Sequence, residues 1–455
     1  MLKNNLKIIR KGKCILKEQP FVYVLKSKYR TDRCDSCLKT GHLGKVLKCS
    51  GCQYVYYCNR ECQTNGWKIH KAECVCLKRA AGKIVPDAAR VILRIILKLN
   101  DGGGAEKGYY TDKFYRKFKD LMSHFPDIQN DQRRIEHVES LTAVLHNILT
   151  VDLMPNQTDF LAIYGRMIVN AFNILDQEMN SIGTGIYLGV SVTDHSCKPN
   201  AVATFDGITL YIRTIEDLPS VDWSKIFISY VDLMDTTETR RHDLEKNYYF
   251  LCKCERCLDD KEPIEMNAGA CPNAKCQAFI SFDTIKSYPT KCAKCNECIS
   301  EKDAQRFKDI MQTTRMHLDS MKMSSVAYLD ICSILVAKQR GVLHKMNVLF
   351  LKTLDLAFES AIGVEKWDEA LEYGMELLPG FRKYNGDFNP LVGLLHMKVG
   401  KIQLFKNYPR DALHNLNKAS DILKITYGEE HNLYKNELVP LLIQAANECD
   451  QNDSD

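Results

Sequence analysis

The cysteines of this chain fall into groups whose spacing is typical of metal ligands. The first group combines C-x2-C, C-x2-C, C-x3-C and H-x3-C spacings between residues 34 and 74. A structural Zn²⁺ takes four thiolate or imidazole ligands, so this group predicts two zinc sites. A segment this short buries too little apolar surface to fold alone, and zinc should stabilise it. Scattered free cysteines would not give this regularity. The predicted ligands are Cys34, Cys37, Cys49, Cys52, Cys58, Cys62, His70 and Cys74.

A second group contains only three ligands, in a C-x-C-x2-C pattern formed by Cys252, Cys254 and Cys257. A closed zinc site needs a fourth. Cys197, in the segment VTDHSCKPN at 192–200, is the natural candidate. The alternative is that Cys197 is a small buried core residue.

A third group consists of CPNAKC at 271–276 and KCAKC at 291–295. Two such knuckles are typical of a zinc ribbon, here with Cys271, Cys276, Cys292 and Cys295 as ligands and Cys298 as an alternative ligand. The sequence therefore predicts three zinc ions, or four if this ribbon binds metal. The remaining cysteines have no partner pattern and are expected to pack in the core; they are Cys14, Cys76, Cys332 and Cys449.

Length and composition indicate an intracellular protein of several domains. The 455 residues are enough for two to four domains with apolar cores. The net charge of +5 does not indicate a dedicated nucleic-acid-binding protein. The N-terminus has no apolar run typical of a signal peptide, and no stretch is apolar enough to cross a membrane. Reduced, metal-binding cysteines in the cytoplasm or nucleus are expected.

The sequence pattern also predicts the main elements. Apolar residues at helical spacing predict a helix in VPDAARVILRIILKL at 85–99, with Pro86 near its start. Residues 183–215 alternate in polarity and break at glycines, as short strands do. The chain from about residue 301 to 447 is expected to be helical. Two helix pairs in this tail are similar to tetratricopeptide repeats.

The first cysteine group resembles the MYND zinc finger, including YCNRECQ at 57–63 and WKIHKAEC at 67–74. The two zinc sites of that family interleave. The resemblance therefore implies one ion bound by Cys34, Cys37, Cys58 and Cys62, and another bound by Cys49, Cys52, His70 and Cys74. It also implies a module that binds short Pro-containing peptides.

Together with VTDHSCKPN and YYFLCKCERC at 248–257, the finger makes nearly the whole chain resemble the SET-and-MYND-domain lysine methyltransferases. The resemblance implies an α+β fold with a β-rich SET domain split by the finger, and GKCILKEQPFVYVL at 12–25 as the first SET strands. The implied domains are 1–33 (first part of SET, without the usual Gly-rich start), 34–74 (MYND finger), 75–165 (helical insertion), 166–246 (core SET), 247–300 (post-SET and zinc ribbon) and 301–455 (helical tail similar to tetratricopeptide repeats).

The activity implied by this resemblance is methyl transfer from S-adenosylmethionine to a lysine amine of a histone or non-histone protein. A free lysine has a pKa near 10.4 and is almost always charged at neutral pH, so an apolar channel must lower that pKa. Tyr230, in FISYVDL, matches the catalytic tyrosine of the family, and Tyr248 matches a second tyrosine that lines the lysine channel.

The cofactor-binding residues implied by the resemblance are Asn170, Asp194, His195 and Phe250, of which Phe250 matches an aromatic that stacks on adenine. Three departures from the family pattern raise doubt about activity. The Gly-x-Gly segment is missing, and an asparagine of the family is replaced by Asp194. The third departure is LPSVDWSKIF at 218–227, which we expect to be a surface loop.

Two other functions compete with the enzyme. The chain could be a catalytically impaired adaptor or transcriptional regulator that binds Pro-rich partners through the finger. The less favoured alternative is DNA binding by basic residues of the finger, namely Lys45, Lys48, Arg60, Lys68 and Lys71. We expect a monomer without membrane association, present in cytoplasm and nucleus and connected with chromatin.

Overall fold

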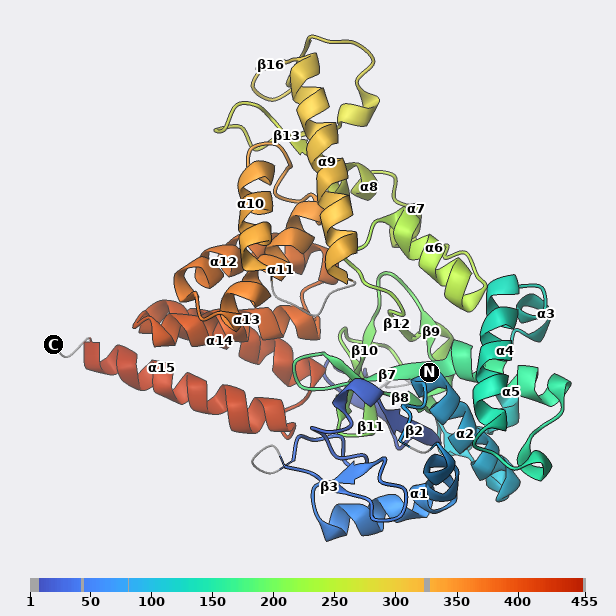
Figure 1. Cartoon of the computed structure of the whole chain (residues 1–455). Helices are drawn as coiled ribbons and strands as arrows, with labels where there is room; N and C mark the ends of the chain where they lie inside the picture. Colours follow the sequence, from blue (N-terminus) through green and yellow to red (C-terminus); the bar gives the residue numbers. More distant parts are fainter. Residues whose placement is uncertain (1–7, 42–44, 81, 323–327, 453–455) are drawn as a thin grey trace, which may run out of the picture. The chain divides into compact units, whose positions relative to one another are not determined.

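The computed structural model describes residues 8–41, 45–80, 82–322 and 328–452. The departure expected at the Gly-x-Gly segment falls largely on residues 1–7, which lie outside the described residues. The mixed helix and strand architecture confirms the predicted α+β class. The chain forms two compact units (Figure 1). The first unit contains Met1–His195, Pro199–Ile228 and Leu244–Phe250, and the second contains Ser196–Lys198, Ser229–Asp243 and Leu251–Asp455.

The first unit has two three-stranded antiparallel sheets. One has the order β1 (Cys14–Glu18), β11 (Thr209–Thr214), β10 (Ala201–Asp206). The other has the order β2 (Val22–Leu25), β8 (Ser181–Ile186), β7 (Ala171–Leu175). Strands far apart in sequence therefore pair, and Val22, Val24 and Ile186 of the second sheet join an apolar core that also contains residues of the helices.

Residues 34–74, which resemble a MYND finger, belong to the first unit and lie between β2 and α2 in sequence. This segment contains the short strands β3 (Leu47–Lys48) and β4 (Tyr56–Tyr57), followed by α1 (Arg60–Arg79). Asn59 caps this helix, because its side chain accepts a hydrogen bond of 2.9 Å from the backbone N–H of Cys62. The cap fixes the start of the helix that carries Cys62, His70 and Cys74.

Helices α2 (Asp87–Asn100), α3 (Phe125–Ile128), α4 (Gln132–His146) and α5 (Gln157–Asn170) complete the first unit. Residues 89–96 of α2 are all buried, which explains the almost continuous apolar run there. A short hairpin of β5 (Gly108–Tyr109) and β6 (Tyr115–Arg116) interrupts the region predicted to be helical.

Residues 218–227 are not the simple surface loop that we expected. The backbone of Leu218 exchanges two hydrogen bonds of 2.8 Å with Ile9, and Trp223 is buried in the short helix Trp223–Lys225. Asp222 caps that helix by accepting from the backbone N–H of Ser224. The apolar area of one tryptophan fixes the segment to the unit, whereas its polar neighbours remain exposed or half-buried.

Most of the second unit is helical, which confirms the predicted C-terminal helical region. α6 (Thr237–Tyr248) contributes residues to both units. Further along the chain are α7 (Glu255–Leu258), α8 (Glu262–Met266), α9 (Glu301–Lys322), α10 (Leu329–Gln339), α11 (Val348–Gly363), α12 (Trp367–Asn385), α13 (Pro390–Phe405), α14 (Pro409–Thr426) and α15 (Val439–Asn452). Successive helices from α10 to α14 pack on one another. Among the described residues, every helix is too short or too polar to cross a bilayer.

Two small antiparallel sheets lie between α8 and α9 in sequence. The strands β13 (Gly269–Ala270) and β14 (Phe279–Ile280) form one, and β15 (Thr290–Lys291) and β16 (Cys298–Ile299) form the other. We refer to residues 269–299 as the ribbon. It carries the third cysteine group.

Candidate functional site

The finger brings its eight ligands together in two interleaved sets. In the first, Cys34, Cys37, Cys58 and Cys62 have all four ligand atoms within 4.8 Å of one another. In the second, the same holds for Cys49, Cys52, His70 and Cys74, all of which are buried. Thiolates and one imidazole at this spacing suit tetrahedral Zn²⁺. The sets match those implied by the resemblance, and the donor chemistry fits the metal.

A buried polar network surrounds the histidine of the second set. Nε2 of His70 lies 3.4 Å from Sγ of Cys52, and Nδ1 lies 3.0 Å from Oε2 of Glu73. Glu73 is 0% exposed and contacts Nε of Arg90 at 2.7 Å and Nη2 of Arg94 at 2.8 Å. A carboxylate on Nδ1 fixes the ring so that Nε2 faces the metal side.

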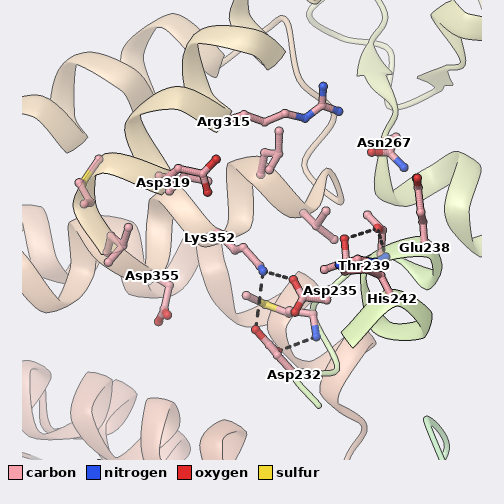
Figure 2. A pocket seen from close by; sticks show the side chains of 17 residues that line it. Asp232, Asp235, Glu238, Thr239, His242, Asn267, Arg315, Asp319, Lys352 and Asp355 are labelled. Carbon is pink, nitrogen blue, oxygen red and sulfur yellow. Dashed lines mark hydrogen bonds and ion pairs between the residues drawn. The ribbon is translucent and has the colours of Figure 1, made fainter. Parts of the chain in front are cut away.

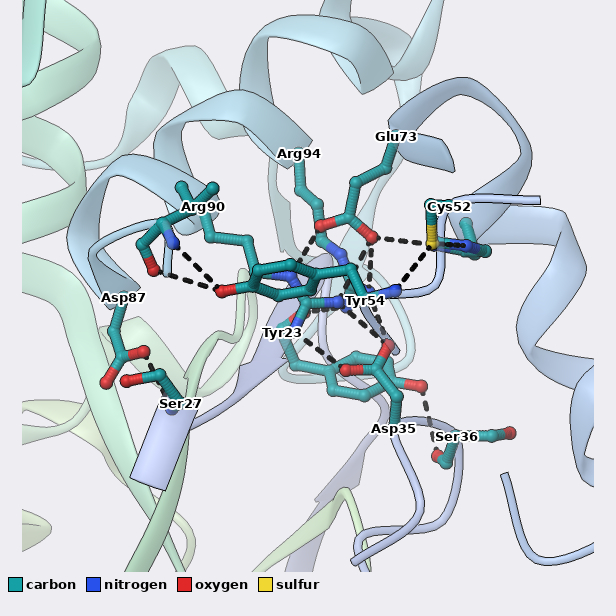
Figure 3. A network of polar contacts seen from close by, with 12 residues as sticks. Tyr23, Ser27, Asp35, Ser36, Cys52, Tyr54, Glu73, Asp87, Arg90 and Arg94 are labelled. Carbon is teal, nitrogen blue, oxygen red and sulfur yellow. Dashed lines mark hydrogen bonds and ion pairs between the residues drawn. The ribbon is translucent and has the colours of Figure 1, made fainter. Parts of the chain in front are cut away.

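The same network extends to the other set and to the sheet (Figure 3). Asp35, the residue after Cys34, accepts from Arg90 at 2.8 Å and from Arg94 at 2.7 Å. Arg94 also donates to the backbone carbonyl of Tyr23 in β2. Burial by itself would raise the pKa values of Asp35 and Glu73, but the two guanidinium groups lower both. Both zinc sets are therefore connected to α2 and β2 through charged groups.

The cluster proposed around Cys197 forms within the second unit. The four Sγ atoms of Cys197, Cys252, Cys254 and Cys257 lie within 4.8 Å of one another, and those of Cys197 and Cys257 are 3.5 Å apart. Cys197 is therefore not an ordinary core residue. Four thiols that converge in this way can bind a metal ion, and the set fits a zinc ion.

Two arginines support this cluster. Arg256 donates to the carbonyl oxygen of Cys197 at 3.2 Å and to that of Leu233 at 2.9 Å. Arg240 is fully buried and donates to the carbonyl oxygen of Asp235 and to Glu262, at 2.5 and 3.3 Å. Burial lowers the pKa of Arg240, but the nearby thiols and Glu262 raise it overall. A positive charge held here offsets the net negative charge of four thiolates on one dication.

The residues before Cys197 form a short parallel pairing in the first unit. β9 (Asp194–His195) pairs with β12 (Phe227–Ile228), so that Asp194 lies opposite Phe227. The Asn200 amide holds the next part of the segment, because it donates to the carbonyl of Lys225 at 2.7 Å and accepts from the N–H of Phe227 at 2.9 Å. Asp194, His195 and Asn200 are thus held against the backbone at 225–228 within the first unit.

The end of α6 places an aromatic side chain beside His195. Tyr248 is the last residue of the helix, and Tyr249 adopts a left-handed φ of 59°. Its hydroxyl donates to Asp131 at 3.1 Å, which stabilises this conformation. The chain then turns so that the ring of Phe250 lies 6.0 Å from that of His195, centroid to centroid. Burial raises the pKa of the Tyr248 hydroxyl.

The other residues implied by the resemblance differ in their surroundings. Asp194 is exposed, whereas Asn170 is half-buried at the end of α5. The Asn170 amide donates to the carbonyl oxygens of Met122 and Arg166, both at 2.8 Å. Its nitrogen therefore supports the backbone, and only its oxygen is left to face a ligand. Tyr230 belongs to the second unit and follows β12 by two residues.

The second unit contains a cavity of about 920 Å³ that begins at Asp232, two residues after Tyr230 (Figure 2). Nζ of Lys352 contacts the carboxylates of Asp232, at 3.7 Å, and Asp235. Among the described residues that line the cavity, Arg315 is the only other formally charged cation, so carboxylates are in excess. They are Asp232, Asp235, Glu238, Asp319 and Asp355. Such a cavity favours a cationic side chain.

Sequence reasoning missed Glu73, Arg90, Arg94, Arg240 and Arg256. One signal was present: two arginines at i and i+4 interrupt the apolar run of α2, and charged residues on a buried helix require partners. The partners could not be read from the sequence, because they come from segments on either side of the finger.

Known proteins resemble this chain over most of its length. The MYND finger profile matches residues 34–74. The human protein named histone-lysine N-methyltransferase SMYD3 is 28% identical over 453 residues, covering 98% of this chain and 94% of the relative. Histone-lysine N-methyltransferase ASHR1 of Arabidopsis thaliana is 28% identical over 92% of this chain and 88% of its own. N-lysine methyltransferase SMYD2-A of Xenopus laevis is 25% identical over 90% and 89%.

Proposed function

We propose that this chain belongs to the SET-and-MYND-domain family and is an S-adenosylmethionine-dependent protein-lysine N-methyltransferase. The observation that carries the proposal is the similarity over 98% of the chain to a protein named as a histone-lysine N-methyltransferase. The match extends beyond the finger, whose profile covers only residues 34–74. The finger alone would indicate protein interaction, whereas the remaining length supports an enzyme.

The residues near β9 fit the proposed cofactor in part. Bound S-adenosylmethionine supplies a methyl group already activated by its sulfonium, so the protein must mainly bind and align the reactants. The Phe250 ring offers a flat apolar face to an adenine, and His195 lies beside it. The exposed carboxylate of Asp194 attracts an ammonium group and repels a carboxylate. This asymmetry favours one orientation of the amino-acid end.

The two tyrosines are proposed to prepare the lysine amine. The raised pKa of Tyr248 keeps its phenol neutral, so that its oxygen can accept a hydrogen bond from the substrate Nζ. The hydroxyl of Tyr230 would contact the same nitrogen, so that the lone pair of the nitrogen is directed at the methyl donor. Loss of the ammonium proton to water is favoured by a low local dielectric, to which the ring of Tyr248 would contribute.

The acidic cavity near Tyr230 leads us to propose a substrate class. Peptides with an additional Lys or Arg close to the target lysine would place that charge among the carboxylates of the cavity. We expect such peptides to have a lower KM than peptides with neutral residues at those positions. The charge-swap variant Asp319→Lys should reduce this preference and leave kcat nearly unchanged.

The experiment that tests the proposed activity uses isothermal calorimetry with S-adenosylmethionine and methyl transfer to a lysine-peptide array. Tyr230→Phe should retain cofactor binding and lose at least about a hundredfold in kcat, because the hydroxyl acts only during transfer. Tyr249→Phe is the matched control and should keep full activity, since its hydroxyl contacts Asp131. Absence of cofactor binding by the full chain would overturn the proposal.

The match to the MYND finger also favours a second candidate function, a non-catalytic adaptor for Pro-rich partners. It requires that partner binding survives in Tyr230→Phe and is lost in Cys49→Ala, which removes a ligand of the buried set. Full partner binding by Cys49→Ala, measured by pull-down with a proline-rich peptide, would exclude the finger as the binding module.

A further inference from the structure

We propose that the ribbon is a fourth zinc centre, bound by Cys271, Cys276, Cys292 and Cys295 and separate from the clusters of the finger and of Cys197. The four Sγ atoms lie within 4.8 Å of one another. Sγ of Cys271 is 3.5 Å from that of Cys295, and Sγ of Cys276 is 4.0 Å from that of Cys292.

These distances match a metal-centred tetrahedron. With Zn–S bonds of about 2.3 Å, the sulfurs of a tetrahedral site lie about 3.8 Å apart. A disulfide would require about 2.05 Å, and all four thiols are free. Four soft thiolates in tetrahedral arrangement select zinc, or iron, over the harder divalent cations. In a reducing compartment, a structural zinc is the simplest occupant.

The backbone already holds both knuckles in metal-binding turns. The N–H of Cys276 donates to the carbonyl of Asn273 at 2.8 Å, which closes the first turn. In the second, the N–H of Asn296 donates to the carbonyl of Cys292 at 2.9 Å, and Asn296 adopts a left-handed φ of 60°. Asparagine tolerates this conformation better than most residues, so the turn is built into the sequence.

The structure also distinguishes between the two possible ligands near the end of the ribbon. Cys298 is exposed on β16 and does not belong to the cluster, whereas Cys295 is half-buried within it. The neighbour of Cys298 on the strand, Ile299, is buried. Because successive side chains of a strand point to opposite faces, the burial of Ile299 turns Cys298 outward. Cys298 is therefore a natural control.

The metal would fix the ribbon against the helices of the second unit. The ring of Phe282 stacks on that of Phe307 in α9, with centroids 4.7 Å apart. At the other end, the N–H of Ala270 donates to the carbonyl of Val342 at 2.8 Å, and Asn347 donates to the carbonyl of Ala268 at 3.0 Å. Strands of two residues cannot hold this arrangement without a further constraint, and a bound ion supplies it.

The test is the zinc content of the full chain, purified without chelator and measured by native mass spectrometry. We expect four zinc ions per chain, three in Cys276→Ser and four in Cys298→Ser. Three ions in the unmodified chain, together with no further loss in Cys276→Ser, would overturn the proposal. So would loss of one ion in Cys298→Ser. The result does not depend on methyltransferase activity, and an inactive chain with four ions would still support it.

A second measurement avoids any misfolding of the serine variants. In the unmodified protein, iodoacetamide should modify Cys298 rapidly, while Cys271, Cys276, Cys292 and Cys295 react only after a zinc chelator is added. Modification of Cys276 or Cys295, which are half-buried, at the rate of Cys298 before the chelator would contradict a bound metal.

Discussion

The pKa values of carboxyl groups that are shielded from water shift in opposite directions in the two units. In the first unit, Asp35 and Glu73 are buried, and ion pairs with Arg90 and Arg94 lower their pKa values. In the second, burial, together with the nearby charge of Glu359, raises the pKa of Asp355 to about 7. Among the described residues, Asp355 makes no hydrogen bond or ion pair. The first arrangement stabilises a fold, whereas the second leaves a charge to be matched by a ligand.

The second cysteine set of the finger and the ribbon set also differ in the groups that surround them. The second set of the finger is completely buried, and the His70–Glu73 contact connects it to two arginines. The ribbon set is only partly buried, and its surroundings are apolar contacts such as that of Phe282 with Phe307. These two thiol sets are therefore supported differently, the second finger set by buried ion pairs and the ribbon set by aromatic packing.

The strongest test of this comparison is the substitution Glu73→Ala. It leaves Asp35 as the only carboxylate for two buried guanidinium groups, so we expect the free energy of unfolding to fall by about 3–5 kcal/mol. The measurement is urea denaturation followed by circular dichroism. Glu61→Ala, at an exposed position of the same helix, should change stability by less than about 0.5 kcal/mol. Equal effects of the two changes would show that the network contributes nothing.

The ribbon should respond to apolar truncation instead. Phe282→Ala removes a ring that is 5% exposed, and we expect a loss of about 3 kcal/mol in the unfolding of the second unit. Phe279→Ala, at a ring that is 47% exposed in the same segment, should cost less than about 0.5 kcal/mol. Thermal unfolding with bound zinc measures both. A ribbon held by metal alone would show no difference between these variants.

The smallest expected effect is that of a substitution at Asp355, which should raise the free energy of unfolding rather than lower it. Its pKa of about 7 in the fold lies above its usual 3.8. Between these values the folded chain binds more protons than the unfolded chain, so stability falls as pH rises through this range. The side chain of Asp355→Asn cannot ionise, so this variant should be more stable than the parent by about 2 kcal/mol at about pH 8. This value is half of the free energy that corresponds to the full pKa shift, because water still reaches the site.

Near pH 4 the difference between Asp355→Asn and the parent should shrink to well below its value at about pH 8, since the carboxyl is then protonated in the fold and partly protonated in the unfolded chain. Differential scanning calorimetry from about pH 4 to 8 measures the trend. Asp421→Asn, at an exposed aspartate of α14, should show no such dependence. A destabilised Asp355→Asn at about pH 8 would mean that the carboxylate is paired in solution.

Much of the candidate site follows from local sequence. Cysteines two to five positions apart must lie close in space, so their spacing alone predicts the zinc knuckles. The apolar period of α2 and the tail indicated helices, and both are helical. The family motifs located Tyr230, Tyr248 and Phe250, whose roles stay predictions. Burial of Trp223 could not be predicted, because its neighbours in sequence are polar.

The sequence by itself determined which residues can bind metal and which segments are helices, because both depend on spacing along the chain. Only the tertiary structure decided the partners that are distant in sequence. It placed Cys197 beside Cys257, paired Glu73 with Arg90 and Arg94, and turned Cys298 away from the ribbon cluster. These contacts depend on how strands and helices pack, and packing is set by the burial of whole apolar faces rather than by any local pattern.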